Sequence, residues 1–317
     1  MCPPLYRQLL HSWPLEEASP GPTSCAGPTL LRQPCASTHV ANGDCDSLGI
    51  IESSANEPVS ANDAASTLDP GSMDDHVLAA MLASDAGDHL VALRDRLMRT
   101  GQWGGWYPEE QGDAEAHNLL MDALTRRRNE DGILSEEGHD DGHRLGHDRV
   151  WIVDPLDGSS DFGRGADEWA VHVALVEAGR GIAAAVSLPA IGMVFGTGTP
   201  PVVPDVQRER PVIVTGRSRV RIDGYRVAEA LDAELMTCGS AGVKAMLVVT
   251  GQVDSYIHAG PLWEWDVCAP AIVAEAAGLI VTDAGGNPLI YNKSRAVAPG
   301  FVVSRPEIAD QVLAALR

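Results

Sequence analysis

The pattern of apolar and polar positions after residue 73 begins with two predicted helices. Apolar residues recur at a spacing of three to four over residues 77–97, directly behind Asp74 and Asp75, which can cap a helix. A second helix is predicted over residues 113–128, with acidic residues at its start and arginines at its end, as the helix dipole favours. Asp113, judged by its local sequence alone, is predicted to be the N-cap of this second helix.

Short apolar runs rich in β-branched residues predict strands in the rest of the chain. They lie at 133–134, 150–153, 169–177, 181–195, 212–215, 253–258 and 279–282. Further helices are predicted at 224–233, 240–250, 267–277 and 306–316. The alternation of helix and strand in the second half of the chain predicts an α/β fold.

Two changes in composition divide the chain. Residues 1–72 are rich in Pro, Ser, Thr and Asn without a periodic apolar pattern, and they are predicted to be a disordered leader or an over-called start before Met73. The run Pro200–Asp205 is read as a connector. We therefore expect an N-terminal subdomain over 73–205 that carries the main site, and a C-terminal subdomain over 206–317 that completes it.

Composition and charge limit the classes of partner. The 317 residues are 44% hydrophobic with a formal net charge of −21, and the mean hydropathy is −0.06. These values predict a soluble globular protein of one large or two modest domains, without a nucleic acid polymer or a membrane as partner. No secretion signal accompanies the six cysteines, so a reducing, cytoplasmic location is expected. A small anionic substrate would need cations to bridge it to such an acidic chain.

The segment that follows the predicted strand 150–153 carries the candidate chemistry. Asp154 and Asp157 flank Pro155, which fixes φ and removes an amide donor, so both carboxylates are expected on one side of a rigid turn with the Leu156 carbonyl between them. Such an oxygen cluster suits Mg²⁺. The amides of Gly158–Ser160 can open a helix whose free N–H groups favour a phosphate. Metal and phosphate would then meet at one point.

By residue type alone, an Asp-Pro-x-Asp-Gly run is an ordinary acidic turn. The full string from Asp154 to Ser159, followed by Phe162, resembles the signature D-P-[LI]-D-G-[ST] of the inositol monophosphatase superfamily. Its companion segments are also present, since Ser135–Gly138 is similar to the G-E-E segment of the family and Trp265–Gly278 is similar to its second signature. Asp266 in that second segment, taken alone, is also a normal N-cap.

Further segments resemble one branch of this superfamily, the 3′(2′),5′-bisphosphate nucleotidases. They are Gly239–Lys244, Trp265–Pro270 and Tyr291–Lys293. The resemblance implies a layered αβαβα sandwich and hydrolysis of the 3′-phosphate of 3′-phosphoadenosine 5′-phosphate, a by-product of sulfate assimilation. It also implies that Ser240 and Lys244 contact the substrate, although a lone helix lysine is by default a solvated side chain.

The resemblance implies roles for the other site residues, with two or three Mg²⁺ ions as cofactor. Those assigned to metal ions are Glu136, Asp154 and the Leu156 carbonyl for the first, and Asp154, Asp157 and Asp266 for the second. Asp113 and Ser159 would deprotonate the attacking water, with Glu136 beside them, while the amides of Gly158, Ser159 and Ser160 would hold the phosphate. The sequence departs from the family pattern at two positions. Residue 159 is a serine where the family usually has threonine, and Gly112 precedes Asp113 where the family commonly has a Lys or Ala segment.

Other functions remain open at this point. Within the superfamily, the substrate could instead be an inositol monophosphate or fructose 1,6-bisphosphate. A different class is a catalytically silent member that acts as a regulatory partner; it predicts a lost metal ligand, yet Glu136, Asp154, Asp157 and Asp266 are all present. The resemblance also implies inhibition by Li⁺. A homodimer is possible.

Overall fold

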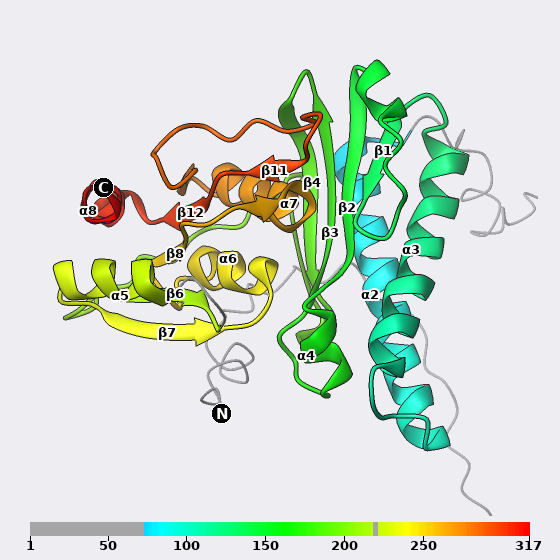
Figure 1. Ribbon diagram of the computed structural model, residues 1–317, viewed down its shortest axis with the longest axis horizontal. Coiled ribbons are helices and arrows are strands. Elements are labelled where there is room, and N and C mark those ends of the chain that lie inside the picture. Colours follow the sequence, from blue (N-terminus) through cyan, green and yellow to red (C-terminus); the bar gives the residue numbers. More distant parts are fainter. Residues whose placement is uncertain (1–72, 218–220) are drawn as a thin grey trace, which may run out of the picture. The chain divides into compact units, whose positions relative to one another are not determined.

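The computed structural model describes residues 73–217 and 221–317, which belong to one compact unit (Figure 1). The expected leader, residues 1–72, lies outside the described residues. Helices and sheets alternate in five layers: a helix pair, a sheet, a second helix pair, a second sheet and an outer helix pair. The predicted αβαβα sandwich is therefore confirmed.

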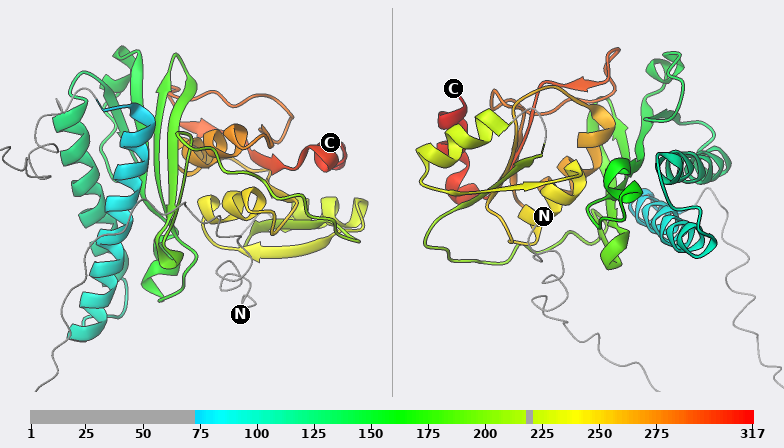
Figure 2. Two further views of the ribbon diagram at one scale, coloured as in Figure 1. Left: turned by 180° about the vertical axis from the view of Figure 1, so that it is seen from behind. Right: turned by 60° about the horizontal axis from the view of Figure 1, so that its bottom comes forward.

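The first layer contains α2 (Asp75–Thr100) and α3 (Tyr107–Arg127), which lie side by side in both views of Figure 2. The side chain of Asp74 caps α2 by accepting from two first-turn amides, and Gly101 ends the helix in the left-handed conformation, as such residues commonly do. Helix α3 begins six residues before Asp113, with a proline in its first turn. The predicted N-cap role of Asp113 is therefore wrong, because this residue lies inside the helix.

The first sheet has the order β1-β2-β3-β4-β5, with only β1 and β2 parallel. Its strands are β1 (Gly132–Ser135), β2 (Arg149–Asp157), β3 (Ala170–Glu177), β4 (Arg180–Leu188) and β5 (Met193–Gly196). The short helices η2 (His143–Gly146), α4 (Ser159–Gly163) and η3 (Pro189–Ile191) connect them. Alternate residues of β3 join two cores: Val171, Val173 and Leu175 pack toward α2 and α3, whereas Ala170, Ala174 and Val176 pack toward the central helices.

The second sheet has the order β10-β12-β8-β6-β7, in which β6 pairs parallel with β7 and β8. Its strands are β6 (Val212–Gly216), β7 (Glu234–Cys238), β8 (Ser255–His258), β10 (Ile280–Thr282) and β12 (Phe301–Ser304). Helices α5 (Arg221–Ala230) and α8 (Pro306–Leu316) cover its outer face. A small ladder joins β9 (Leu262–Trp263) to β11 (Val297–Ala298).

Two helices lie between the sheets, α6 (Ala241–Val249) and α7 (Glu264–Ala276). Every residue of α6 is buried, as expected for a helix that is apolar on all sides except at Lys244. The strands of the first sheet all precede the extended connector at 200–211 and those of the second all follow it. A boundary near residue 205 stays a prediction. In the described ranges, no helix is both long and apolar enough to cross a membrane.

Candidate active site

A β-bulge at the end of β2 sets the direction of two aspartates. Asp154 lies opposite His172 of β3, and Asp157 lies opposite Ala170, so two residues of β2 face a single residue of β3. In a regular strand, positions three apart point to opposite faces of the sheet. The extra residue places both carboxylates on the face that Ala170 and His172 share, which is the face toward the central helices. Both carboxylates therefore lie on one side, as expected, and a β-bulge that contains Pro155 places them there.

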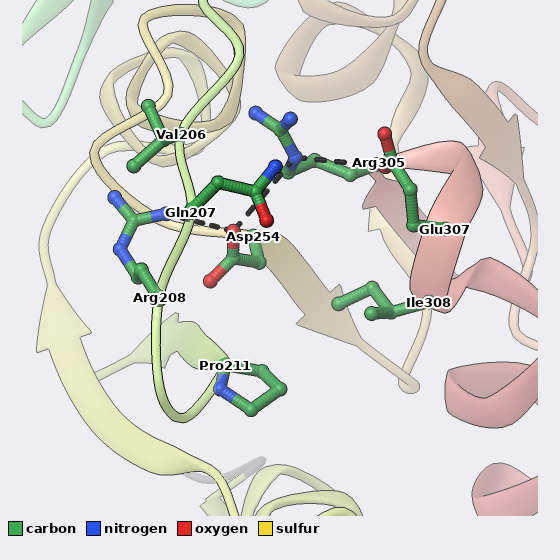
Figure 3. Close-up of a pocket in the computed structure, with 8 residues that line it drawn as sticks. All are labelled: Val206, Gln207, Arg208, Pro211, Asp254, Arg305, Glu307 and Ile308. Carbon is green, nitrogen blue, oxygen red and sulfur yellow. Dashed lines mark hydrogen bonds and ion pairs between the residues drawn. The ribbon is translucent and has the colours of Figure 1, made fainter.

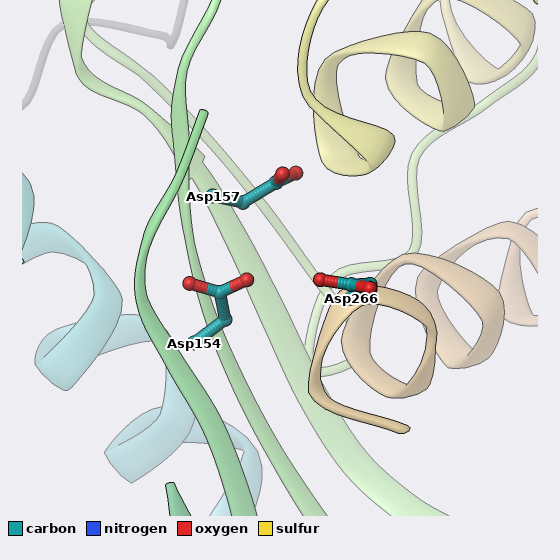
Figure 4. Close-up of side chains that lie close together, drawn as sticks. All are labelled: Asp154, Asp157 and Asp266. Carbon is teal, nitrogen blue, oxygen red and sulfur yellow. The ribbon is translucent and has the colours of Figure 1, made fainter. Parts of the chain in front are cut away.

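A third carboxylate reaches this pair from α7 (Figure 4). One oxygen each from Asp154, Asp157 and Asp266 lies within 4.8 Å of the others. Trp263, and not Asp266, is the N-cap of α7, so the N-cap role considered for Asp266 is wrong. Asp266 still serves the helix end from inside the first turn, because its Oδ2 accepts a hydrogen bond of 3.1 Å from the Trp263 amide.

The three carboxylates differ in the direction in which their surroundings shift the pKa. Burial, and then the charges of neighbouring carboxylates, raise the pKa of Asp154 well above its usual value. Burial and the charge of Asp157 raise the pKa of Asp266 to about 7. Burial opposes ionisation of Asp157 as well, but the neighbouring His172 and the hydrogen bond from Ser240 contribute to holding its pKa below the usual value. Ionisation is therefore disfavoured at two of the three carboxylates, those of Asp154 and Asp266.

These residues fit a divalent cation. Asp154 is wholly buried, and its Oδ2 has no hydrogen-bond partner in the part of the chain that the structure describes. A buried carboxylate oxygen of this kind is costly unless a cation or a donor reaches it. Three hard oxygen ligands that converge on one point suit Mg²⁺, Mn²⁺ or Ca²⁺. A cation here would offset the repulsion between the carboxylates.

The N-terminus of α6 fixes Asp157. Its Oδ2 accepts hydrogen bonds from the Ser240 hydroxyl at 2.6 Å and the Gly242 amide at 2.7 Å. Ser240 is the N-cap of α6, and its hydroxyl also accepts from the Val243 amide at 3.0 Å. The positive end of the helix dipole adds to these contacts. Ser240 therefore positions Asp157, and the expected contact of Ser240 with substrate stays a prediction.

Lys244 lies beneath the same turn. Its Nζ donates to the carbonyl oxygens of Gly239, at 2.7 Å, and Ser240, at 2.5 Å, and the residue is 5% exposed. The ammonium lies 5.1 Å from the ring centroid of Tyr256, which is a cation–π distance. Lys244 is thus not a solvated side chain. It holds the turn that carries Ser240, and a direct contact with a substrate phosphate stays a prediction.

Glu136 and Asp113 are not among the three residues whose oxygens converge. Glu136 follows β1, and its amide donates to the Val153 carbonyl at 3.3 Å, which brings it beside the end of β2. The Glu136 side chain reaches solvent, but partial burial of its carboxylate raises the pKa of this group. Burial and the charges of Glu137 and Glu136 raise the pKa of Asp113 to about 7. Asp113 therefore senses the charges of these acids from α3, and the proton relay expected of it stays a prediction.

The segment after Asp157 is built to end the strand and open a short helix. Gly158 has φ +93°, and a Cβ there would lie 2.8 Å from the Glu168 carbonyl oxygen, so a side chain would be strained. The first amides of α4, those of Ser159 and Ser160, have no partner within the helix. Leu156 is 2% exposed, and its amide donates to Asp154 Oδ1 at 3.1 Å. Phosphate binding by the amides, and metal binding by the Leu156 carbonyl, stay predictions.

Sequence reasoning missed several residues around the site. His172 contacts the acidic cluster from β3, as developed below. Arg217, which follows β6, donates to Asp161 Oδ1 of α4 at 2.6 Å and so ties the second sheet to this short helix. Trp263 and Trp265 stack beside Asp266, with ring centroids 4.9 Å apart and an interplanar angle of 10°, and Trp263 is 47% exposed. A charged residue directly after a strand was the available signal for Arg217.

A pocket between the connector and α8 shares no residue with the acidic cluster (Figure 3). Its charged groups are already engaged with one another. Arg208 Nη1 donates to Asp254 Oδ1 at 2.7 Å, and Arg305 Nε lies 3.8 Å from the same oxygen. These contacts are those of a structural ion-pair network. The chemistry therefore favours the acidic cluster as the functional site.

Fold and site together define a layered α/β protein with an acidic centre, suited to a cation, between its first sheet and its central helices. The chain belongs to the inositol monophosphatase family, whose model matches residues 108–317. This family is metal-dependent, in keeping with the carboxylate cluster.

Particular relatives are the 3′-phosphoadenosine 5′-phosphate phosphatase of Mycobacterium tuberculosis, strain CDC 1551, and the 3′(2′),5′-bisphosphate nucleotidase CysQ of Escherichia coli K12. The first is 41% identical over 246 residues, covering 73% of this chain and 89% of the relative. The second is 30% identical over 237 residues, covering 70% of this chain and 96% of the relative. The crystal structure of CysQ from Bacteroides thetaiotaomicron matches with a TM-score of 0.60 and 27% identity, covering 72% of this chain and 96% of that one.

Proposed function

We propose that the protein is a Mg²⁺-dependent phosphomonoester hydrolase that converts 3′-phosphoadenosine 5′-phosphate and water to AMP and phosphate. The observation that carries the proposal is the convergence of Asp154, Asp157 and Asp266 beside the amides that open α4. The relatives with 41% and 30% identity are named for this substrate class, which supports it.

The chain divides the work of hydrolysis among its residues. Glu136, Asp154, Asp157 and Asp266 would hold the cations, which when bound neutralise the phosphoryl oxygens and acidify water. The first amides of α4 would hold and orient the phosphate. As the water oxygen bonds to phosphorus and the bond from phosphorus to the 3′-oxygen breaks, Asp113, with Ser159, would accept a proton of the water, and the 3′-oxygen would take up a proton from solvent to leave as the hydroxyl of AMP. A pKa of about 7 suits Asp113 to proton transfer near neutral pH.

Phosphate release from a small panel of substrates tests this proposal. With Mg²⁺, kcat/KM should be at least about tenfold higher for 3′-phosphoadenosine 5′-phosphate than for inositol 1-phosphate or fructose 1,6-bisphosphate, a difference of roughly 1.4 kcal/mol. Excess chelator should abolish release and Mg²⁺ should restore it. Ca²⁺ should inhibit, because it is larger and imposes no octahedral geometry. We also expect inhibition by Li⁺.

The same panel identifies the competing functions. A preference for the inositol or sugar phosphate would replace the nucleotidase with the broader phosphatase. No release from any substrate by folded, Mg²⁺-loaded protein would indicate a regulatory family member without activity. Full activity in excess chelator would remove the metal-dependent mechanism.

The Lys244→Ala variant distinguishes a substrate contact from support of the turn. Because the ammonium bonds to the carbonyls of Gly239 and Ser240, its loss should loosen the contact between Ser240 and Asp157. We expect kcat/KM to fall about ten- to a hundredfold for nucleotide and inositol substrates alike, which corresponds to the loss of charge-assisted hydrogen bonds.

The matched control is Lys293→Ala. Lys293, the other lysine of the chain, also donates to a backbone carbonyl, that of Val297, and its Nζ lies 3.6 Å from the buried Glu264 Oε1, so its loss should lower the melting temperature and change kcat/KM less than the loss of Lys244 does. A loss confined to 3′-phosphoadenosine 5′-phosphate would instead show that Lys244 contacts the nucleotide directly, as the sequence predicts.

A further inference from the structure

His172 is a polar residue on an otherwise apolar face of β3. Its neighbours on that face, Ala170 and Ala174, are small and buried, and its partner on β4 is Val186. The His172 side chain is wholly buried. A buried imidazole is costly unless its nitrogens find partners, so the contacts of the ring decide what it does.

The two ring nitrogens face two different segments of the site. Nδ1 lies 3.1 Å from the carbonyl oxygen of Trp265, the residue before Asp266, and a carbonyl can only accept. Nε2 lies 3.2 Å from Asp157 Oδ2 without the geometry of a hydrogen bond, and Nδ1 lies 3.9 Å from Asp154 Oδ2. One side chain therefore touches both aspartates of β2 and the backbone that carries Asp266.

The first turn of α6 closes on the same ring. A Cβ at Gly242 would lie 2.1 Å from His172 Nε2, so the absence of a side chain at 242 is what admits the imidazole. The Gly242 amide donates to the Asp157 oxygen that His172 also approaches. Strand β2, helix α6 and helix α7 thus all meet at His172.

We infer that His172 is a positioning residue of the cation site, which sets Asp157 against Asp266 so that their oxygens converge before a cation arrives. This inference rests on the proposed metal site. Partners of this kind, which orient the metal ligands without touching the metal, commonly change metal affinity ten- to a hundredfold when they are replaced. His172 takes no part in the transfer of the phosphoryl group.

Two substitutions separate the contacts of the ring. In His172→Asn the side-chain amide can reach the position of Nδ1, so it keeps the bond to the Trp265 carbonyl and loses the contact with Asp157. In His172→Gln the longer amide can reach the position of Nε2 and keeps the contact with Asp157. Binding of Mg²⁺ to the metal-free protein, measured by titration calorimetry without substrate, compares the two variants.

We expect His172→Asn to weaken Mg²⁺ binding about ten- to a hundredfold, and His172→Gln to stay within about threefold of the original protein. At saturating Mg²⁺, kcat of His172→Asn should recover to within about threefold, because the reacting groups are intact. The control His89→Asn makes the same replacement at a half-exposed histidine paired with Glu115, and should leave Mg²⁺ binding unchanged.

Gly242→Ala provides a test that keeps the histidine. The added methyl group must displace the buried imidazole, and this overpacking outweighs the helix propensity that alanine gains, so both Mg²⁺ binding and the melting temperature of the metal-free protein should fall while the histidine itself is kept. Unchanged Mg²⁺ binding in His172→Asn, or equal weakening in His172→Asn and His172→Gln, would overturn the inference, the second by showing that the ring only fills space. No Mg²⁺ binding by the original protein would instead remove the metal site itself.

Discussion

Asp154→Asn should lower kcat/KM at least about a thousandfold for every phosphate ester, because a metal ion contributes several kcal/mol to stabilising the charge of the transition state. Asp154 is the member of the cluster that the resemblance assigns to both cations. The same change should stabilise the metal-free protein above neutral pH, since it removes a charge that burial and the neighbouring carboxylates oppose. Activity and stability are thus expected to change in opposite directions.

Phosphate release and thermal unfolding in excess chelator measure the two effects. Asp122→Asn is the matched control, because Asp122 is an exposed acid of α3 that pairs only at the surface with Arg126, and neither quantity should change appreciably. Activity above about a tenth of the original in Asp154→Asn would contradict a shared ligand role. A large loss of stability in Asp154→Asn would show that the Asp154 carboxylate stabilises the fold, contrary to the repulsion from the neighbouring carboxylates described above.

Removal of metal should make stability depend on pH in a particular direction. Folded-state pKa values near 7 for Asp113 and Asp266 lie above the unfolded value near 4. Between these values the folded chain binds more protons, so the free energy of unfolding falls as pH rises. We expect the melting temperature in chelator to fall on the order of 5 °C between pH 5.5 and 8. Mg²⁺, which binds the ionised form, should stabilise more at pH 8.

Scanning fluorimetry at several pH values, with chelator and with saturating Mg²⁺, checks this expectation. Asp266→Asn should flatten the pH dependence in chelator, because it removes one of the raised groups. Asp157, whose pKa is lowered, contributes stability that is lost only as pH falls through the acidic range, outside this window. A melting temperature in chelator that rises between pH 5.5 and 8 would contradict the repulsion described for the cluster.

The elements that the sequence predicts best are those with local signals at both ends. Asp74 and Gly101 mark the ends of α2, and Pro306 marks the start of α8, because caps and prolines act within one helical turn. The start of α3 was missed, although Pro108 in its first turn is a usable signal. Strand β7 was also missed, because its pairing with β6 involves residues about 20 positions away and its own sequence does not alternate.

The site shows a similar division between local and distant information. Asp154, Asp157 and Asp266 stand in strings specific enough to identify, and the structure brings their oxygens together. What holds them there is not local: the Ser240 hydroxyl that bonds Asp157 is 83 positions away in sequence, and the Trp265 carbonyl that faces His172 is 93 positions away. A single histidine in an apolar alternation was the one local sign that β3 contributes to the site.

The stacked indoles of Trp263 and Trp265 give the site an optical reporter. Trp263 is half exposed and is the N-cap of α7, and its amide bonds to Asp266. Any ligand that draws Asp266 toward it would shift the first turn of α7 and with it the overlap and solvation of the two rings. Intrinsic tryptophan emission should therefore follow occupancy of the site in real time, and Trp263→Phe would separate this signal from that of the other tryptophans. Fast mixing could then resolve the arrival of a cation from that of a phosphate ester without waiting for product.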